Sequence, residues 1–324
     1  MTVLRFMTWN VQNLFDAGTP FGPPTQVDFD AKLAGLAGVI NTYAPDVLAL
    51  QEVGSDTALA ALQAQTPQLK YRMLGIPDPR GIRVALLSRR ALNSRHDLAA
   101  FPAGVLPTQT GDDPPGPAGP PTVSQVGRPG LQATIRYGNR DIVVIACHLK
   151  SKLLSYPGGR FSPLDEDERA RFAGYALNRR TGEAVALRVF LNTLLDGDGT
   201  RLPVVLAGDL NDEVTAATSQ ILLGPPGSEI GTTGFSQADS GDGNRMWNLA
   251  PLLPDGEHVS RRYRGRDELI DHILVSHHLV TRVDEVHSVP ATAPLPSMTD
   301  DPEPPNPAIP SDHAAITATF NLAA

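Results

Sequence analysis

Apolar residues recur along the chain with two spacings, one typical of strands and one typical of helices. Alternation of apolar and polar positions, with many β-branched and aromatic side chains, predicts a strand. The expected strands are residues 2–10, 46–50, 82–87, 131–137, 141–147, 203–207, 269–275, 285–289 and 314–320. A two-residue turn, Gly138-Asn139, separates two of these strands and predicts a β-hairpin.

Apolar residues three and four positions apart predict three helical regions. The first is expected to begin at Asp30, acting as a cap, and to end near residues 44–45. The second covers residues 57–65, and the third covers residues 165–195, where Gly182 marks a point at which the helix could break. Strands mixed with a few helices and hairpins favour sheets that pack on each other, with helices outside.

Two segments interrupt this pattern because they are rich in proline and glycine. Residues 101–130 contain eight prolines and six glycines, and residues 290–310 contain eight prolines. Either segment could link two domains. However, predicted strands flank both segments, and the polar residues discussed below extend from residue 10 to residue 313. We therefore expect one domain over residues 1–324, with surface loops at about 101–130 and 290–310.

Composition narrows the range of functions. The net charge of −8 argues against a protein that holds nucleic acid by a broad basic surface. A single cysteine, Cys147, excludes an internal disulfide. No apolar run is long enough to cross a membrane, so no membrane partner is expected, and no obligate protein partner is evident. No signal peptide is visible, which favours a cytoplasmic protein, or a secreted one if a signal was removed.

Polar side chains that could carry chemistry lie at the ends of apolar strands. These segments are residues 7–15, 50–53, 146–151, 207–212 and 269–274, and residues 311–313 precede the last strand. They supply the carboxylates of Glu52, Asp209, Asp271 and Asp312 and the amides of Asn10 and Asn211. Oxygen donors without a thiolate cluster suit Mg²⁺ or Mn²⁺ rather than Zn²⁺. Such a set of residues points to hydrolysis of a phosphate ester.

The order of these segments resembles the endonuclease/exonuclease/phosphatase superfamily, which includes deoxyribonuclease I, apurinic endonucleases, sphingomyelinases and inositol polyphosphate 5-phosphatases. The matching motifs are Trp9-Asn10, Gln51-Glu52, the strand end at His148, Gly208-Asp209-Leu210-Asn211, Ile270-Asp271-His272-Ile273-Leu274 and Ser311-Asp312-His313. The resemblance implies an α+β fold, a four-layer α/β sandwich. In it, two packed, mostly antiparallel β-sheets are flanked by helices, as in deoxyribonuclease I.

The same resemblance implies a role for each matching residue. Metal binding is implied for Glu52, with Asn10 and Asp312 near the ion. The implied catalytic residues are His148, Asp209, Asn211, Asp271 and His313, with Asp271 orienting His313 and His148 contacting the scissile phosphate. Substrate contacts are implied for Arg83, Arg128 and Lys150. Whether Asp209 or His313 accepts the proton of the attacking water stays open.

Two functions remain in competition. The first is a metal-dependent nuclease that cleaves DNA or RNA by attack of water on phosphate, which His148 and Lys150 favour. The second is a phosphatase or phosphodiesterase acting on a small-molecule or lipid phosphate ester, which the acidic net charge favours. Some nucleases pair the histidine equivalent to His148 with a glutamate on a neighbouring strand. Because residues 80–88 contain no acidic residue, we expect no second histidine–carboxylate pair.

Overall fold

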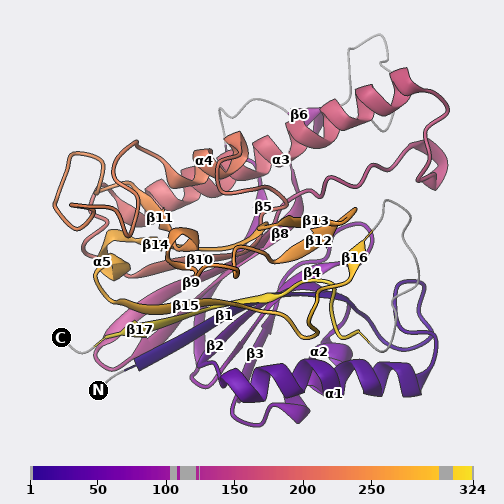
Figure 1. Cartoon of the computed structure of the whole chain (residues 1–324), viewed down its shortest axis with the longest axis horizontal. Helices are drawn as coiled ribbons and strands as arrows, with labels where there is room; N and C mark the ends of the chain where they lie inside the picture. Colours follow the sequence, from indigo (N-terminus) through magenta and orange to yellow (C-terminus); the bar gives the residue numbers. More distant parts are fainter. Residues whose placement is uncertain (1–2, 103–107, 110–121, 124, 299–308, 323–324) are drawn as a thin grey trace.

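Two six-stranded sheets form the frame of the computed structural model, which describes residues 3–102, 108–109, 122–123, 125–298 and 309–322 (Figure 1). Sheet A has the order β15-β17-β1-β2-β4-β3, and sheet B has the order β11-β14-β10-β9-β8-β5. The strands of sheet A are β1 (Val3–Leu14), β2 (Val47–Val53), β3 (Tyr71–Leu74), β4 (Arg83–Ser88), β15 (Val283–Val289) and β17 (Ala315–Asn321). The strands of sheet B are β5 (Leu92–Ala100), β8 (Gln125–Tyr137), β9 (Arg140–His148), β10 (Val204–Asp209), β11 (Met246–Asn248) and β14 (Asp271–Ser276).

Most neighbouring strands in both sheets run antiparallel. The exceptions are β1 with β2 in sheet A and β9 with β10 in sheet B, which pair in parallel. The expected hairpin is confirmed, because β8 and β9 pair from Tyr137 and Arg140 onward around the turn at Gly138 and Asn139.

Helices cover the outer face of each sheet and complete four layers. Helices α1 (Gln26–Tyr43) and α2 (Asp56–Gln65) pack on sheet A, and α3 (Glu166–Leu195) and α4 (Ala217–Leu223) pack on sheet B (Figure 1). The helix–sheet–sheet–helix order confirms the α+β sandwich expected from the sequence. None of the described helices is both long enough and apolar enough to span a bilayer.

Three apolar clusters hold the layers together, and they explain the alternation in the strands. In β1, Phe6 points into the core between the sheets, whereas its neighbour Met7 points toward α1 on the outer face. In β9, Val144 lies between the sheets, and Ile145 packs beneath α3. Both faces of these central strands are therefore buried, which requires apolar residues on both sides.

Some predicted boundaries are wrong for identifiable reasons. Helix α1 begins at Gln26, because the hydroxyl of Thr25 accepts a hydrogen bond from the backbone N–H of Asp28 and caps the helix; Asp30 lies inside it. Helix α3 continues through Gly182 without a break. Strand β5 was not predicted because most of its residues are polar and exposed.

The two proline-rich segments are only partly described. Residues 125–130 belong to β8 rather than to a loop, whereas residues 103–107, 110–121 and 124 lie outside the described residues. In the second segment, residues 299–308 lie outside the described residues. The remaining elements are β6 (Thr108–Gln109), β7 (Thr122–Val123), β12 (Arg261–Tyr263), β13 (Arg266–Glu268), β16 (Ser297–Met298), α5 (His277–Val280) and the 3₁₀ turns Pro157–Gly159 and Ala250–Leu252.

Candidate active site

Three of the predicted site residues form one row across sheet B. Strands β9, β10 and β14 are neighbours, and their register places His148 beside Asp209 and Asp209 beside Asp271. Side chains at paired positions of adjacent strands point to the same face of a sheet. The row lies at the strand ends, where β10 gives way to the turn that carries Asn211.

Sheet A contributes Asn10 and Glu52 from its parallel strands β1 and β2. The side-chain amide of Asn10 donates to Glu52 Oε1 at 3.3 Å and to Asp209 Oδ2 at 3.0 Å, so that it links the two sheets. Glu52 Oε2 accepts the backbone N–H of Asn13 at 3.0 Å. The register of β1 and β2 shifts here, and Glu52 has a left-handed backbone with φ of 65°.

The segment before β17 carries Asp312 and His313 and is held by β1. Ser311 donates its hydroxyl to the carbonyl oxygen of Asn10 at 2.6 Å, and Trp9 donates its ring N–H to the carbonyl oxygen of His313 at 2.9 Å. On the other side, His313 Nδ1 lies 2.7 Å from Asp271 Oδ2. The contact with Asp271 leaves the other ring nitrogen, Nε2, to face the cavity described below.

Surrounding charges set the protonation of His313. Burial of the ring lowers its pKa, but the charges of Asp271 and Asp312 and the hydrogen bond with Asp271 outweigh burial and raise the pKa to about 10. Burial alone would raise the pKa of Asp209. His148, His313 and the amide of Asn10 outweigh that effect and hold the pKa of Asp209 below its usual value.

His148 has a carboxylate partner, so the prediction of no second histidine–carboxylate pair is wrong. Its Nε2 lies 3.4 Å from Asp209 Oδ2. The partner comes from the adjacent parallel strand β10, not from the region of β4 that the prediction considered. Burial and the nearby guanidinium of Arg128 lower the pKa of His148.

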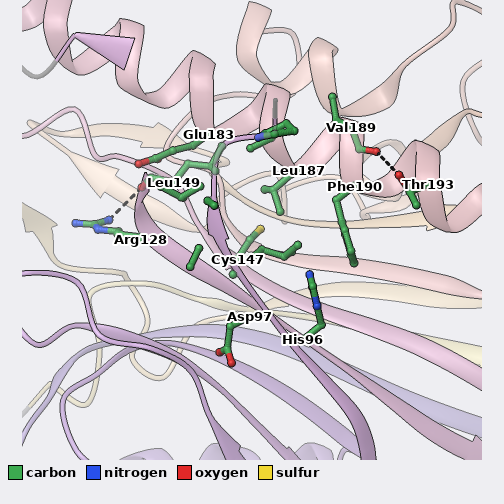
Figure 2. A pocket seen from close by; sticks show the side chains of 17 residues that line it. His96, Asp97, Arg128, Cys147, Leu149, Glu183, Leu187, Val189, Phe190 and Thr193 are labelled. Atoms are coloured by element: carbon green, nitrogen blue, oxygen red, sulfur yellow. Dashed lines mark hydrogen bonds between the residues drawn. The ribbon is translucent and has the colours of Figure 1, made fainter. Parts of the chain in front are cut away.

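Arg128 is buried in the wall of the site and holds a fixed position. Its Nη1 donates to the carbonyl oxygen of Leu149 at 3.0 Å (Figure 2). The same Nη1 contacts His148 Nε2, and Nε of Arg128 lies 3.8 Å from Asp78 Oδ2. Behind it, Glu183 of α3 accepts the backbone N–H groups of Gly127 and Lys150 at 3.2 and 2.7 Å. Arg128, Leu149 and Glu183 also line a second cavity of about 320 Å³ between α3 and sheet B (Figure 2).

A cavity of about 230 Å³ opens where the two sheets meet, and most of the predicted residues line it. Those residues are Asn10, Glu52, Arg128, His148, Asp209, Asn211, Asp312 and His313. Asp271 does not line it; it is 1% exposed and lies behind His313, where the contact with Nδ1 places it. Predicted residues separated by up to about 300 positions in sequence therefore lie together.

Arg83 and Lys150 do not line this cavity. Arg83 donates to the carbonyl oxygens of Gly54 and Gly81, and Lys150 Nζ donates to the carbonyl oxygens of residues 151 and 153. The basic residues that line the cavity besides Arg128 are Arg80, Lys152 and Arg261.

Sequence reasoning also missed several residues that support the site. Glu183 lies in the middle of a charged helix, and Asp78 in a short loop, so no local pattern marks either residue. Ser260 is fully buried and accepts the backbone N–H of Asp271 at 3.0 Å. Lys32 of α1 is buried, and its Nζ donates to the carbonyl oxygen of Pro310 at 2.5 Å, just before the Asp312 segment. The sequence offered one indication of these supporting residues: Lys32 lies among the apolar positions of the first predicted helix.

The donors at the cavity fit a hard divalent cation. Glu52, Asp209 and Asp312 offer carboxylate oxygens, and Asn211 offers an amide. The amide oxygen of Asn10 accepts the backbone N–H of Gln12 at 3.0 Å, and its second lone pair is the one that it could offer to an ion. In addition, one ligand atom each from Asp209, Asp271 and His313 lies within 4.8 Å of the others, and Asp271 Oδ1 is buried without a hydrogen bond among the described residues.

The chain belongs to the Endonuclease/Exonuclease/phosphatase family, because the model of that family matches residues 7–313. Members of this family are phosphoesterase hydrolases. The family resemblance that the sequence motifs suggested is thereby confirmed. No curated protein matches the chain.

Solved structures share the fold at low identity. A humanized D. rerio TDP2 carrying 14 mutations has a TM-score of 0.58 at 18% identity, covering 99% of this chain and 100% of that chain. The catalytic domain of human Nocturnin, with a bound sulfate anion, has a TM-score of 0.58 at 16% identity, covering 99% and 94%. A family protein from Bacteroides vulgatus has a TM-score of 0.57 at 16% identity, with 100% of both chains covered.

Proposed function

We propose that the protein is a divalent-metal-dependent phosphodiesterase whose substrate is DNA or RNA. The observation that carries this proposal is the meeting of both sheets at one cavity. There, the carboxylates of Glu52, Asp209 and Asp312 lie with two histidines, each beside a carboxylate. A structure similar to this one, D. rerio TDP2, was solved with a single-strand DNA product, which supports a nucleic acid substrate.

Each side chain at the cavity would have a separate role in phosphodiester hydrolysis. A bound Mg²⁺ or Mn²⁺, held by Glu52 with Asn10 and Asp312 near it, would neutralise charge on the phosphate. His313, kept as an imidazolium by Asp271, would hold a phosphate oxygen through Nε2. Asp209 and Asn211 would orient the attacking water, while His148 and Arg128 would contact the phosphate from the opposite wall. Because an imidazolium has no free lone pair, Asp209, which is ionised, would accept the proton of the water.

Two observations favour the alternative, a phosphatase or phosphodiesterase for a small-molecule or lipid ester. The net charge is −8, and a cavity of about 230 Å³ is small enough for a single phosphorylated group. A nuclease with this charge must obtain its affinity from the site itself rather than from a basic surface.

A substrate panel distinguishes these possibilities. We expect turnover of single-stranded DNA or RNA and of bis(4-nitrophenyl) phosphate with Mg²⁺ or Mn²⁺, and no turnover in EDTA until the metal is restored. Hydrolysis of 4-nitrophenyl phosphate without hydrolysis of any diester would favour the alternative. Full diesterase activity in excess EDTA would overturn the role of the metal.

Two substitutions test the site itself. We expect Asp312→Ala and His313→Ala each to lower kcat by about 10²-fold or more while the circular dichroism spectrum is retained, because each removes a group at the reacting phosphate. His287→Ala is the matched control, since His287 pairs with Glu257 at 3.0 Å and does not line the cavity. Wild-type turnover by both site variants would show that the cavity is not the active site.

A further inference from the structure

Aromatic side chains surround the mouth of the catalytic cavity. Phe21 comes from the turn between β1 and α1, Phe161 from the segment before α3, and Tyr263 from the end of β12. All ten phenylalanines lie in the described part of the chain, and Phe21 and Phe161 are the two most exposed of them, at 39% and 45%. Both line the cavity. Because exposed phenylalanine carries a solvation cost, this placement indicates a use for the two rings.

A basic side chain, that of Arg261, lines the same cavity as these rings and His313. The backbone of Arg261 forms a bridge with His313, which fixes β12 against the site. The guanidinium of Arg261 lies 5.2 Å from the centre of the Tyr263 ring, and its Nε is buried without a hydrogen bond among the described residues. An arginine in this position can contact a phosphate next to the scissile one and can also stack on a planar base.

We propose that the rim formed by Phe21, Phe161, Tyr263 and Arg261 (the aromatic rim) binds unpaired nucleobases that flank the scissile phosphate. This inference rests on the proposed function and narrows its substrate to single-stranded nucleic acid or unpaired ends. Aromatic rings bind bases by stacking on their faces, and every base has such a face. In a duplex, the neighbouring base pairs stack on both faces of each internal base. A paired strand therefore cannot stack its bases on the aromatic rim.

The rim also explains how an acidic protein could hold a polyanion. Stacking supplies affinity that does not depend on a basic surface, and it is worth roughly a 5- to 150-fold change in the dissociation constant (Kd) for each base. Phe21 is supported from behind by Phe15, whose ring centre lies 5.7 Å away, whereas Phe161 has no ring partner among the described residues. Phe161 is therefore the better residue to vary.

Binding to three probes tests the proposal. The probes are a fluorescent single-stranded oligonucleotide, the same sequence as a blunt duplex, and a base-free deoxyribose phosphate oligomer of equal length. In EDTA, we expect wild-type protein to bind the single strand more tightly than both other probes. We expect Phe161→Ala to raise the Kd for the single strand roughly 5- to 150-fold and to leave the Kd for the base-free oligomer unchanged.

Control variants separate stacking from loss of fold or of apolar area. Phe161→Tyr should keep the wild-type Kd, and Phe161→Leu should behave like Phe161→Ala. Tyr71→Ala should change nothing, because Tyr71 is 44% exposed on the edge strand β3 and does not line the cavity. Equal Kd values of wild type and Phe161→Ala for the single strand, or an equal loss on the base-free oligomer, would overturn the proposal.

Hydrolysis of bis(4-nitrophenyl) phosphate with Mg²⁺ distinguishes this failure from failure of the proposed function. If wild type hydrolyses this diester but Phe161→Ala binds the single strand with the wild-type Kd, only the inference about the aromatic rim is contradicted. If wild type hydrolyses no diester, the proposed function falls and the inference falls with it.

Discussion

Four residues that line the cavity between the two sheets have a left-handed backbone, although none of them is glycine. They are Gln12, Asn13, Glu52 and Asn211, with φ between 46° and 65°. This conformation costs roughly 1–3 kcal/mol per residue, and it persists only where the surrounding structure enforces it. At Glu52, the strained backbone turns the carboxylate toward Asn10 and the backbone of Asn13. The position of the Glu52 carboxylate therefore lowers the free energy of unfolding of the protein.

The charge of His313 should make the stability of the metal-free protein depend on pH. Its pKa is raised from 6.5 to about 10 in the folded state, so its stabilising contribution is complete below pH 6.5 and is lost as the pH rises through 10. In EDTA, we expect the free energy of unfolding of wild type relative to His313→Gln to decrease between pH 6.5 and 10. Urea unfolding at a series of pH values measures this difference. A difference that is constant over the range would contradict the raised pKa.

At the level of elements, the close approach of β9 and β10 positions His148 and Asp209. Gly208 precedes Asp209 and pairs with Cys147, the residue before His148; its φ is 153°, and a Cβ atom at this position would lie 1.9 Å from the carbonyl oxygen of Cys147. Only glycine allows this pairing, because backbone atoms cannot move aside as a flexible side chain can. The parallel pair of β9 and β10 thereby keeps His148 and Asp209 at paired positions, next to Asp271 on β14.

Substitution of Gly208 should therefore damage both stability and activity. We expect Gly208→Ala to lower the free energy of unfolding by at least about 2 kcal/mol, because the added methyl group forces the two strands apart. We also expect a loss of kcat at temperatures where the variant remains folded. Gly138→Ala is the matched control, since no atom lies within 4 Å of its added Cβ and only the left-handed backbone (φ 62°) is affected. A Gly208→Ala variant as stable as Gly138→Ala would contradict this account.

At the level of the whole molecule, the excess of acidic over basic residues disfavours nonspecific binding of nucleic acid. The chain carries 35 acidic and 27 basic residues, and the basic residues at the cavity are few. Lys152 also lies 3.3 Å from Glu268, and Arg80 lies 4.0 Å from Asp78, so that part of their charge is already neutralised. Binding of a single strand should depend on few phosphate contacts.

The salt dependence of binding tests this distribution. Each neutralised phosphate of a single strand contributes about 0.7 to the slope of log Kd against log salt. With two to four contacts, we expect a slope of roughly 1.4 to 2.8, and Arg261→Ala should reduce it by about 0.7. Fluorescence anisotropy between about 50 and 300 mM NaCl gives the slope. A slope above about 5 would show a wide basic interface that the described residues do not provide.

The sequence by itself determined nine strands of the two sheets, the order of the motifs and eight of the residues that line the cavity. Burial on both faces of the central strands demands apolar runs, and the polar residues that end these runs, such as Glu52 and Asp209, stand out against them. The pattern failed where polar residues form an edge strand, as in β5, because exposure removes the apolar signal.

Only the tertiary structure decided which side chains face the cavity and which partners they have. The family resemblance implies a substrate contact for Lys150, but Lys150 Nζ donates to backbone carbonyl groups, and it is Lys152 that lines the cavity. The pairing of His148 with Asp209, the hydrogen bonds from Gly127 and Lys150 to Glu183, and the placement of Phe21, Phe161 and Tyr263 around one cavity depend on contacts between distant segments. The physical reason is that strand register and packing, which arise from the whole chain, fix these contacts, whereas local spacing fixes only the elements.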